Sequence, residues 1–129
     1  MNKVSAYART RVLALLILPS LLGMSLPASA EEVLRIVTLT PTSAEAQQKG
    51  LVAVSTDARK VYKAAKGCES VTFFADPTSL ATGSVSVWSS REDLDAFLKS
   101  PAYKAILERL KPFMKGAPET KIYKVTEPK

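Results

Sequence analysis

The order in which strand-like and helix-like hydrophobic patterns follow one another constrains the fold of this chain more than any other feature. Residues 33–40 (VLRIVTLT) are β-branched and almost continuously apolar, which is typical of a buried strand. Apolar residues then recur at helical spacing, before two shorter strand patterns, a second helical stretch and a last strand. The expected elements are a strand at 33–40, a helix at 43–66, strands at 69–75 and 80–88, helical structure from 90 to 114 with a break at 100–101, and a strand at 120–126.

This βαββαβ order predicts an α+β, ferredoxin-like domain, in which two helices cover one face of a four-stranded antiparallel sheet. The expected helix starts carry capping signals. Thr42 and Glu45 form a T-x-x-E capping box, and Ser90 with Asp93 forms a second one. Pro101 is well suited to the first position of a restarted helix.

The second face of such a sheet is left uncovered. We expect Val71, Phe73, Val85 and Val87 to line it, with the serines of the third strand turned toward the helices. An exposed apolar face of this size is unfavourable in a monomer. Two copies are therefore expected to pack sheet against sheet as a homodimer.

The first thirty residues have the pattern of a secretory signal peptide. Three basic residues precede an apolar run at 12–18, and the segment PASA ends at Ala30 with small residues at the cleavage positions. We expect cleavage after Ala30, export to the periplasm or the medium, and a mature domain at 31–129 without a stable membrane anchor. An uncleaved anchor is the alternative, although the apolar run is short for a membrane span.

Charge and residue usage exclude several classes of function. Residues 31–129 contain 15 basic and 12 acidic residues, and the basic ones are not clustered as nucleic-acid binding requires. The chain has no histidine, which excludes Ser-His-Asp and Cys-His catalysis, His-ligated haem and nearly all zinc sites. The single cysteine, Cys68, is either a small buried hydrophobe or a free thiol that reacts or pairs between chains. We expect no metal and no cofactor.

The region from 31 to 129 resembles the antibiotic biosynthesis monooxygenase (ABM) family of the dimeric α/β-barrel superfamily. The residues that carry the resemblance are Gly67-Cys68, Asp76-Pro77, the run from Trp88 to Leu94, Ser100-Pro101, Tyr103 and Tyr123. The resemblance implies a homodimer with a small apolar pocket in each subunit, between the sheet and the helices. Some members oxygenate quinols or polycyclic phenols with O₂ and no metal or flavin, a related branch degrades haem, and others have no known activity.

The sequence departs from the family pattern at positions that matter for haem. Ser86 stands two residues before the tryptophan, where many members have Glu. Phe97 and Leu98 stand where many have His, and the first strand lacks the Asn of the haem-degrading branch. Haem degradation is therefore not expected.

Trp88 is either a core residue or one wall of a pocket. Ser84 and Ser86 lie on the same strand face and leave volume beside the indole that helix residues or a ligand must fill. The resemblance favours the pocket, and we expect Trp88 and Tyr103 to be catalytic. A tyrosine, a carboxylate or a bound water could take the proton of a substrate, and Tyr103 and Tyr62 are the side chains to test first.

The other candidates for the pocket are apolar or small. The residues expected to bind substrate are Thr38, Tyr62, Phe74, Ser84, Ser86, Phe97 and Phe113. Core packing is the alternative for each aromatic residue. Arg35 lies on the strand face opposite to Thr38 and is expected either at an exposed edge, in a pair with a carboxylate across the dimer, or against an anionic ligand.

Two functions remain open from the sequence. The first is a cofactor-independent monooxygenase acting on a small aromatic or quinol substrate. The second is a non-catalytic domain of the same fold that binds a small ligand or a partner, because a fold does not fix a function.

Overall fold

The computed structural model describes residues 31–127 and contains the predicted order of elements. The expected signal peptide at 1–30 lies outside the described residues. The elements are β1 (Val33–Leu39), α2 (Ala44–Ala64), β2 (Cys68–Ala75), β3 (Thr82–Trp88), α3 (Arg91–Lys99), α4 (Pro101–Leu110), the 3₁₀ helix η2 (Lys111–Phe113) and β4 (Glu119–Lys124). In this part of the chain, no helix is both long and apolar enough to cross a membrane.

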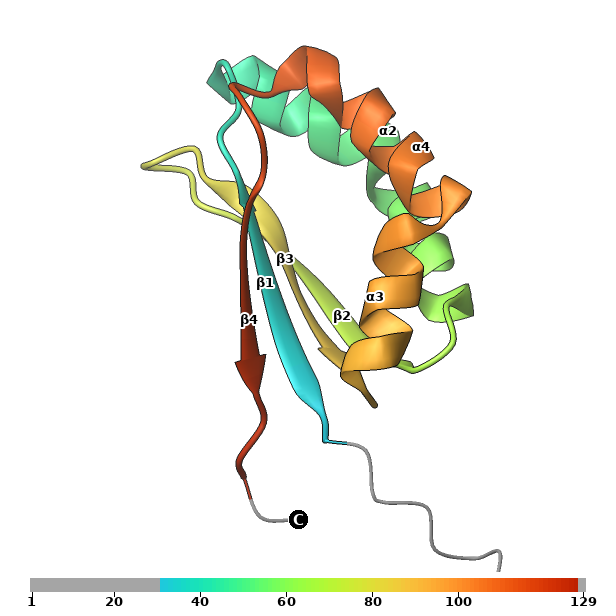
Figure 1. Ribbon diagram of the computed structural model, residues 1–129. Helices are drawn as coiled ribbons and strands as arrows, with labels where there is room; N and C mark the ends of the chain where they lie inside the picture. Colours follow the sequence, from blue (N-terminus) through green and yellow to red (C-terminus); the bar gives the residue numbers. More distant parts are fainter. Residues whose placement is uncertain (1–30, 128–129) are drawn as a thin grey trace, which may run out of the picture.

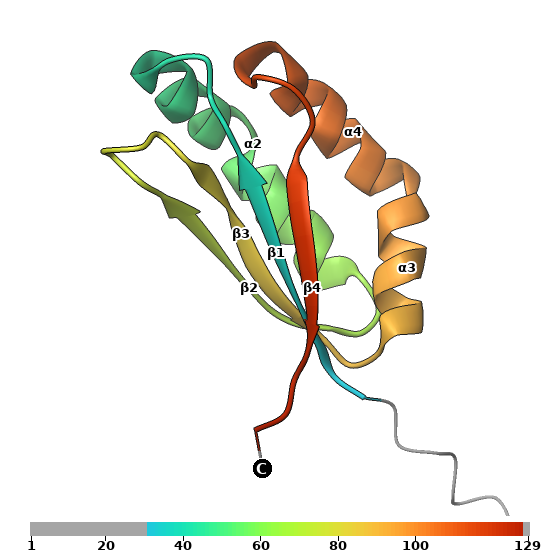
Figure 2. The same ribbon diagram turned by 60° about the vertical axis from the view of Figure 1, so that its left-hand side comes forward.

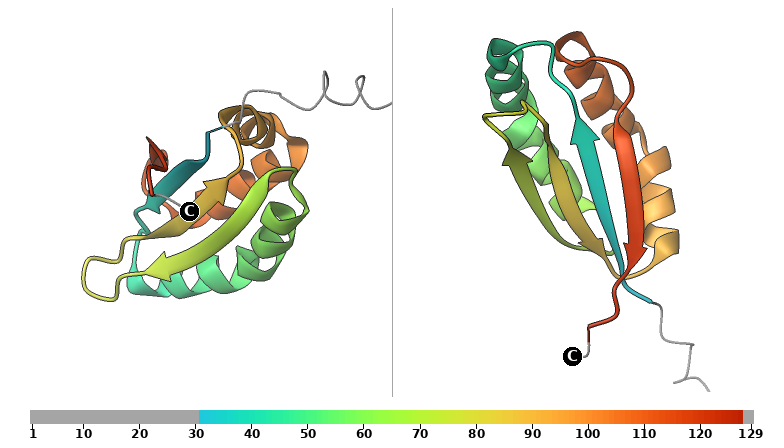
Figure 3. Two further views of the ribbon diagram at one scale, coloured as in Figure 1. Left: turned by 90° about the horizontal axis from the view of Figure 1, so that it is seen from below. Right: turned by 90° about the vertical axis from the view of Figure 1, so that its left-hand side faces the viewer.

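The four strands form one antiparallel sheet in the order β2-β3-β1-β4. All helices lie against one face of it (Figure 1), and the turned view in Figure 2 shows α2 and the α3–α4 pair side by side over that face. The opposite face carries no element of residues 31–127 (Figure 3). The predicted ferredoxin-like fold is confirmed.

Local signals account for the helix ends, with one correction. The predicted break is confirmed at Ser100, which caps α4 through a bond from the Tyr103 backbone N–H. Ser90 caps α3 as predicted. The cap of α2 is Ser43 and not Thr42, because the Ser43 hydroxyl accepts the Ala46 N–H at 3.0 Å.

The sheet register decides which side chains face the helices. Ser84, Ser86 and Trp88 of β3 face them and are buried, as predicted. The prediction that Val71 and Phe73 line the uncovered face is wrong. The hairpin register pairs Val71 with Ser86 and Phe73 with Ser84, so both face the helices. A β-bulge between Cys68 and Ser70 turns Cys68 to the same side.

The uncovered face, called here the open face, is still largely apolar. By register and alternation it carries Leu34, Ile36, Thr38, Phe74, Val85, Val87 and Tyr123. Val85 and Val87 therefore lie where the sequence predicts. Tyr123 is half exposed, and the members of this set on β1 and β3 are partly exposed as well.

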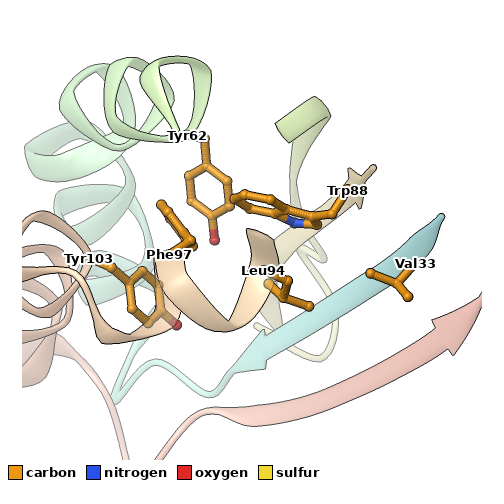
Figure 4. Packing of buried hydrophobic residues seen from close by; sticks show 6 residues of the cluster. All are labelled: Val33, Tyr62, Trp88, Leu94, Phe97 and Tyr103. Carbon is orange, nitrogen blue, oxygen red and sulfur yellow. The ribbon is translucent and has the colours of Figure 1, made fainter. Parts of the chain in front are cut away.

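The core between sheet and helices consists of two clusters. The Trp88 cluster contains Val33, Tyr62, Trp88, Leu94, Phe97 and Tyr103 (Figure 4). The Val54 cluster contains Val37, Leu39, Val54, Ala58, Ile106 and Leu110. Along β1, Arg35 lies between Val33 of the first cluster and Val37 of the second.

Candidate functional site

A cavity lies within the Val54 half of the core, between the sheet and the helices α2 and α4. Its volume is about 60 Å³ as measured for the centres of water-sized spheres. One water needs about 10–15 Å³ by that measure, so the cavity holds roughly four to six water-sized groups, the scale of one aromatic ring. The walls are mainly aliphatic. The polar side chains among them are Ser55, Tyr62, Thr82, Ser84 and Tyr103.

Two tyrosines from different helices meet a buried arginine beside this cavity. Arg35 of β1 is 2% exposed. Its Nη1 donates to the Tyr62 hydroxyl oxygen at 3.2 Å, and its Nη2 donates to the Tyr103 hydroxyl oxygen at 2.5 Å. The guanidinium carbon is also 5.1 Å from the centroid of the Tyr103 ring, within the range of a cation–π contact.

The arrangement leaves the arginine charge without a matching acid. The ion pairs found among residues 31–127 do not include Arg35. Its Nε is buried and has no hydrogen-bond partner in the described structure. An uncompensated buried charge is costly, and orphaned buried donors are rare in native proteins. Arg35 is therefore the polar group of this interior that most needs a further partner.

The Tyr62 hydroxyl holds its proton at neutral pH. Burial raises the pKa of the Tyr62 hydroxyl above its ordinary value of 10.0, although the hydrogen bond with Ser84 and the positive charge of Arg35 act in the opposite direction. The Tyr62 and Ser84 oxygens are 3.4 Å apart. Tyr62, Ser84 and Tyr103, all predicted from the sequence, thus come together at one end of the cavity.

Trp88 lies outside the cavity, within the Trp88 cluster. It is fully buried, and its indole N–H donates to the Ser86 hydroxyl at 2.9 Å. Its ring centroid is 4.8 Å from that of Phe97 and 6.2 Å from that of Tyr62. Ser86 therefore accepts the hydrogen bond of the indole N–H and does not line the cavity. In this geometry, Trp88 packs in the core next to Tyr62 and does not line the cavity.

The remaining predicted site residues lie around or away from the cavity. Phe97 stands behind Tyr103, with ring centroids 4.9 Å apart. Thr38 and Phe74 lie on the open face, since strand alternation turns them away from the helices. Phe113 lies in η2, where its carbonyl accepts the Thr42 N–H, and it does not line the cavity.

Ser55, Thr82 and the aliphatic walls of the cavity were not among the residues expected to bind substrate. Two further omissions bear on the chemistry of the site. Phe73 lines the cavity in place of its neighbour Phe74, because the hairpin register pairs Phe73 with the core-facing Ser84. Arg35 is the second. Its position in the alternating series Val33, Arg35, Val37, Leu39 was a usable signal, because the three hydrophobic members of that series all face the core.

The fold is that of a ferredoxin-like α+β domain, and a small, mainly apolar cavity lies between its sheet and its helices. Comparison with known families identifies it further. The family model described as antibiotic biosynthesis monooxygenase matches residues 33–109. The chain therefore belongs to the antibiotic biosynthesis monooxygenase family.

Solved structures share this fold at low sequence identity. SnoaB of Streptomyces nogalater, described as a cofactor-independent oxygenase, has a TM-score of 0.63 and 15% identity, over 77% of this chain and 97% of its own. The monooxygenase from ActVA-Orf6 of Streptomyces coelicolor, solved with nanaomycin D, has a TM-score of 0.64 and 18% identity, over 76% and 90%.

Rv0793 of Mycobacterium tuberculosis has a TM-score of 0.65 and 18% identity, over 75% of this chain and 97% of its own. At these identities the likeness shows the fold alone. A search of curated proteins finds no match.

Proposed function

We propose that the protein is a cofactor-independent monooxygenase that acts on a small electron-rich phenol or quinol. The observation that carries this proposal is the pair of tyrosine hydroxyls, Tyr62 and Tyr103, at one end of an otherwise mainly apolar cavity. Family membership and the cofactor-independent oxygenase among the structures of the same fold support it. The cavity size favours a substrate with a single ring over a fused polycyclic one.

The reaction that this site would serve needs little from the protein. A phenol loses its proton, and the phenolate transfers an electron to O₂. The resulting radicals combine at the ring carbon opposite the oxygen to form a hydroperoxide. Loss of water then leaves a quinone. The phenol gives up four electrons, one oxygen atom of O₂ enters the product, and the other leaves as water.

Different side chains of the cavity would bind the substrate and exclude water. The hydroxyls of Tyr62, Tyr103 and Ser84 would bind the substrate oxygen and hold the ring in one orientation. The aliphatic walls, among them Val54 and Ile106, would exclude bulk water from the reactive intermediates. No Asp or Glu lines the cavity within residues 31–127. The substrate proton would therefore pass to water.

We further propose that the protein is exported and dimeric. The pattern of residues 1–30 supports export with cleavage after Ala30, which leaves the domain 31–129. The apolar open face supports a homodimer in which two sheets pack against each other, as the family resemblance implies. Gel filtration with light scattering tests the dimer, and N-terminal sequencing of the exported protein tests the cleavage.

Oxygen uptake by the purified protein tests the activity. Single-ring phenols and quinols would be offered in the presence of a metal chelator, and the rate compared with autoxidation. Tyr103→Phe is expected to lower kcat about tenfold or more, because it removes a hydroxyl that binds the reacting oxygen. Arg109→Met, at a half-exposed arginine of α4 that pairs with Asp57, is the control and should keep the wild-type rate. Uptake no faster than autoxidation by a folded wild-type protein would contradict the proposal.

A binding domain without chemistry is the second candidate. The observation that favours it is the lack of a carboxylate among the described residues that line the cavity, which leaves no side chain there that would readily take the proton of a phenol. This function predicts saturable binding of phenols, measured by calorimetry, with oxygen uptake at the autoxidation rate for every substrate.

A further inference from the structure

The bonds between Arg35 and the two tyrosines fix the direction in which the tyrosine hydroxyls can donate. A guanidinium has donors and no acceptor. The oxygens of Tyr62 and Tyr103 must therefore accept from Arg35, at 3.2 and 2.5 Å. Each hydroxyl keeps its own hydrogen for another acceptor.

Acceptors for these two hydrogens are scarce in the protein. The Ser84 oxygen lies 3.4 Å from that of Tyr62, near the upper limit for a hydrogen bond. Within residues 31–127, the hydrogen-bond partner found for the Tyr103 hydroxyl is Arg35 itself. Both tyrosines line the cavity, so an oxygen atom in the cavity is well placed to accept from both.

The charge behind the hydroxyls favours an anionic acceptor. Arg35 is 2% exposed, lacks an ion pair among the described residues and has an unpartnered Nε. A hydroxyl that accepts from a cation is polarised and becomes a stronger donor. A negative oxygen in the cavity would also offset the buried positive charge.

We propose that Tyr62 and Tyr103 form an oxyanion-binding pair polarised by Arg35, so that the cavity holds its ligand as the phenolate. This inference rests on the proposed function, because it takes a phenol as the ligand. Arg35 acts through the tyrosines and is a positioning residue. The proton of the bound phenol leaves to solvent, and the protein raises the proportion of the form that reacts with O₂.

The surroundings of Arg35 leave few competing charges. The titratable side chains that contact its guanidinium are Tyr62 from α2 and Tyr103 from α4. Its register partners on the neighbouring strands, Ser86 of β3 and Ile122 of β4, do not titrate. A pH dependence of ligand ionisation would therefore report the ligand and these two tyrosines.

The test reads ionisation of a bound phenol without turnover. 4-Fluorophenol carries one ring, and its ¹⁹F NMR shift differs between phenol and phenolate. It would be titrated from neutral to alkaline pH, free and bound to the purified protein, under argon. We expect the bound ligand to ionise at lower pH than the free one, with phenolate preferred about tenfold for each donated hydroxyl.

Variants separate the inference from a general effect on folding. Tyr62→Phe and Tyr103→Phe should each lower the preference for phenolate about tenfold, and Arg35→Met should abolish most of it. Arg109→Met is the matched control. Arg109 joins α4 to α2 through Asp57 and the Ala53 carbonyl but lies at the surface, and its loss should leave ligand ionisation unchanged.

The outcomes distinguish this inference from the proposed function. Absence of binding, or equal ionisation of free and bound 4-fluorophenol in the wild type, overturns the inference even if quinols are oxidised. An unchanged preference in both tyrosine variants also overturns it, whether or not Arg35→Met folds. Phenolate binding without oxygen uptake on any phenol leaves the inference standing and removes the oxygenase.

Discussion

Replacing Arg35 by methionine is expected to stabilise the protein. Methionine has a similar length, no charge and no hydrogen-bonding needs, and it suits irregular interior spaces. The substitution removes a buried guanidinium that is 2% exposed and whose Nε has no partner within the described residues. It therefore tests directly whether the arginine is present for stability or for ligand binding.

Opposing effects determine the size of the change. Removing the orphaned Nε gains about 1–3 kcal/mol, and leaving the Tyr103 hydroxyl without its partner costs about as much. Tyr62 keeps its contact with Ser84. The charge then decides the sign, because replacing buried ionic groups by apolar ones of similar volume often stabilises by about 1–4 kcal/mol. We expect the free energy of unfolding to rise by about 1–3 kcal/mol.

Urea denaturation followed by tryptophan fluorescence measures this change, because Trp88 is the only tryptophan of the chain. Each kcal/mol should also raise Tm by about 4–8 °C in a domain of this size. Arg109→Met, at a half-exposed arginine paired with Asp57, is the control and should lose at most about 1 kcal/mol. A loss of more than about 1 kcal/mol in Arg35→Met would refute the reasoning, since it would mean that the buried charge is already compensated.

Three further substitutions separate packing, backbone and ionisation. Trp88→Phe should destabilise by about 1–3 kcal/mol in urea, because it empties part of the core and leaves the Ser86 hydroxyl without the indole donor, while kcat for any oxygenation stays within about twofold. Gly67→Ala should lower the free energy of unfolding by more than about 1 kcal/mol, because Gly67 has φ +83° and a Cβ there would lie 2.5 Å from Asp93 Cβ. A variant as stable as wild type in thermal unfolding would contradict this geometry. The raised pKa of Tyr62 means that the folded state holds its proton more tightly than the unfolded state does. Stability should therefore be complete below the unfolded pKa near 10 and fall as pH rises above it, and urea midpoints of Tyr62→Phe should show a shallower alkaline decline.

The element order could be predicted from the sequence because the signals for it are local. Capping residues and hydrophobic periods are read within one turn or one strand, as Ser90 and the Ser100-Pro101 break illustrate. The facing of β2 could not be predicted in the same way. It depends on the register of the hairpin with β3, which pairs Phe73 with Ser84 and so turns Phe73, and not Phe74, toward the cavity.

The candidate site was predictable in part for a related reason. Tyr62 and Tyr103 were found because both lie on apolar helix faces. Their meeting with Arg35 depends on contacts across 27 and 68 positions of the chain. Trp88 was predicted at the site because it is a large residue beside two serines. Residue spacing does not show which neighbour accepts the hydrogen bond of its indole N–H, and in the structure this acceptor is Ser86.

The position of Arg35 between the Trp88 and Val54 clusters divides the interior into two regions with different freedom to change. The Trp88 cluster is closed and aromatic, and it fixes the fold. The Val54 cluster surrounds the cavity, so exchanging one aliphatic residue for another at Val54 or Ile106 alters the space for a ligand and leaves the aromatic packing intact. The shape of the cavity and the aromatic packing of the Trp88 cluster can therefore be changed by substitutions at separate positions.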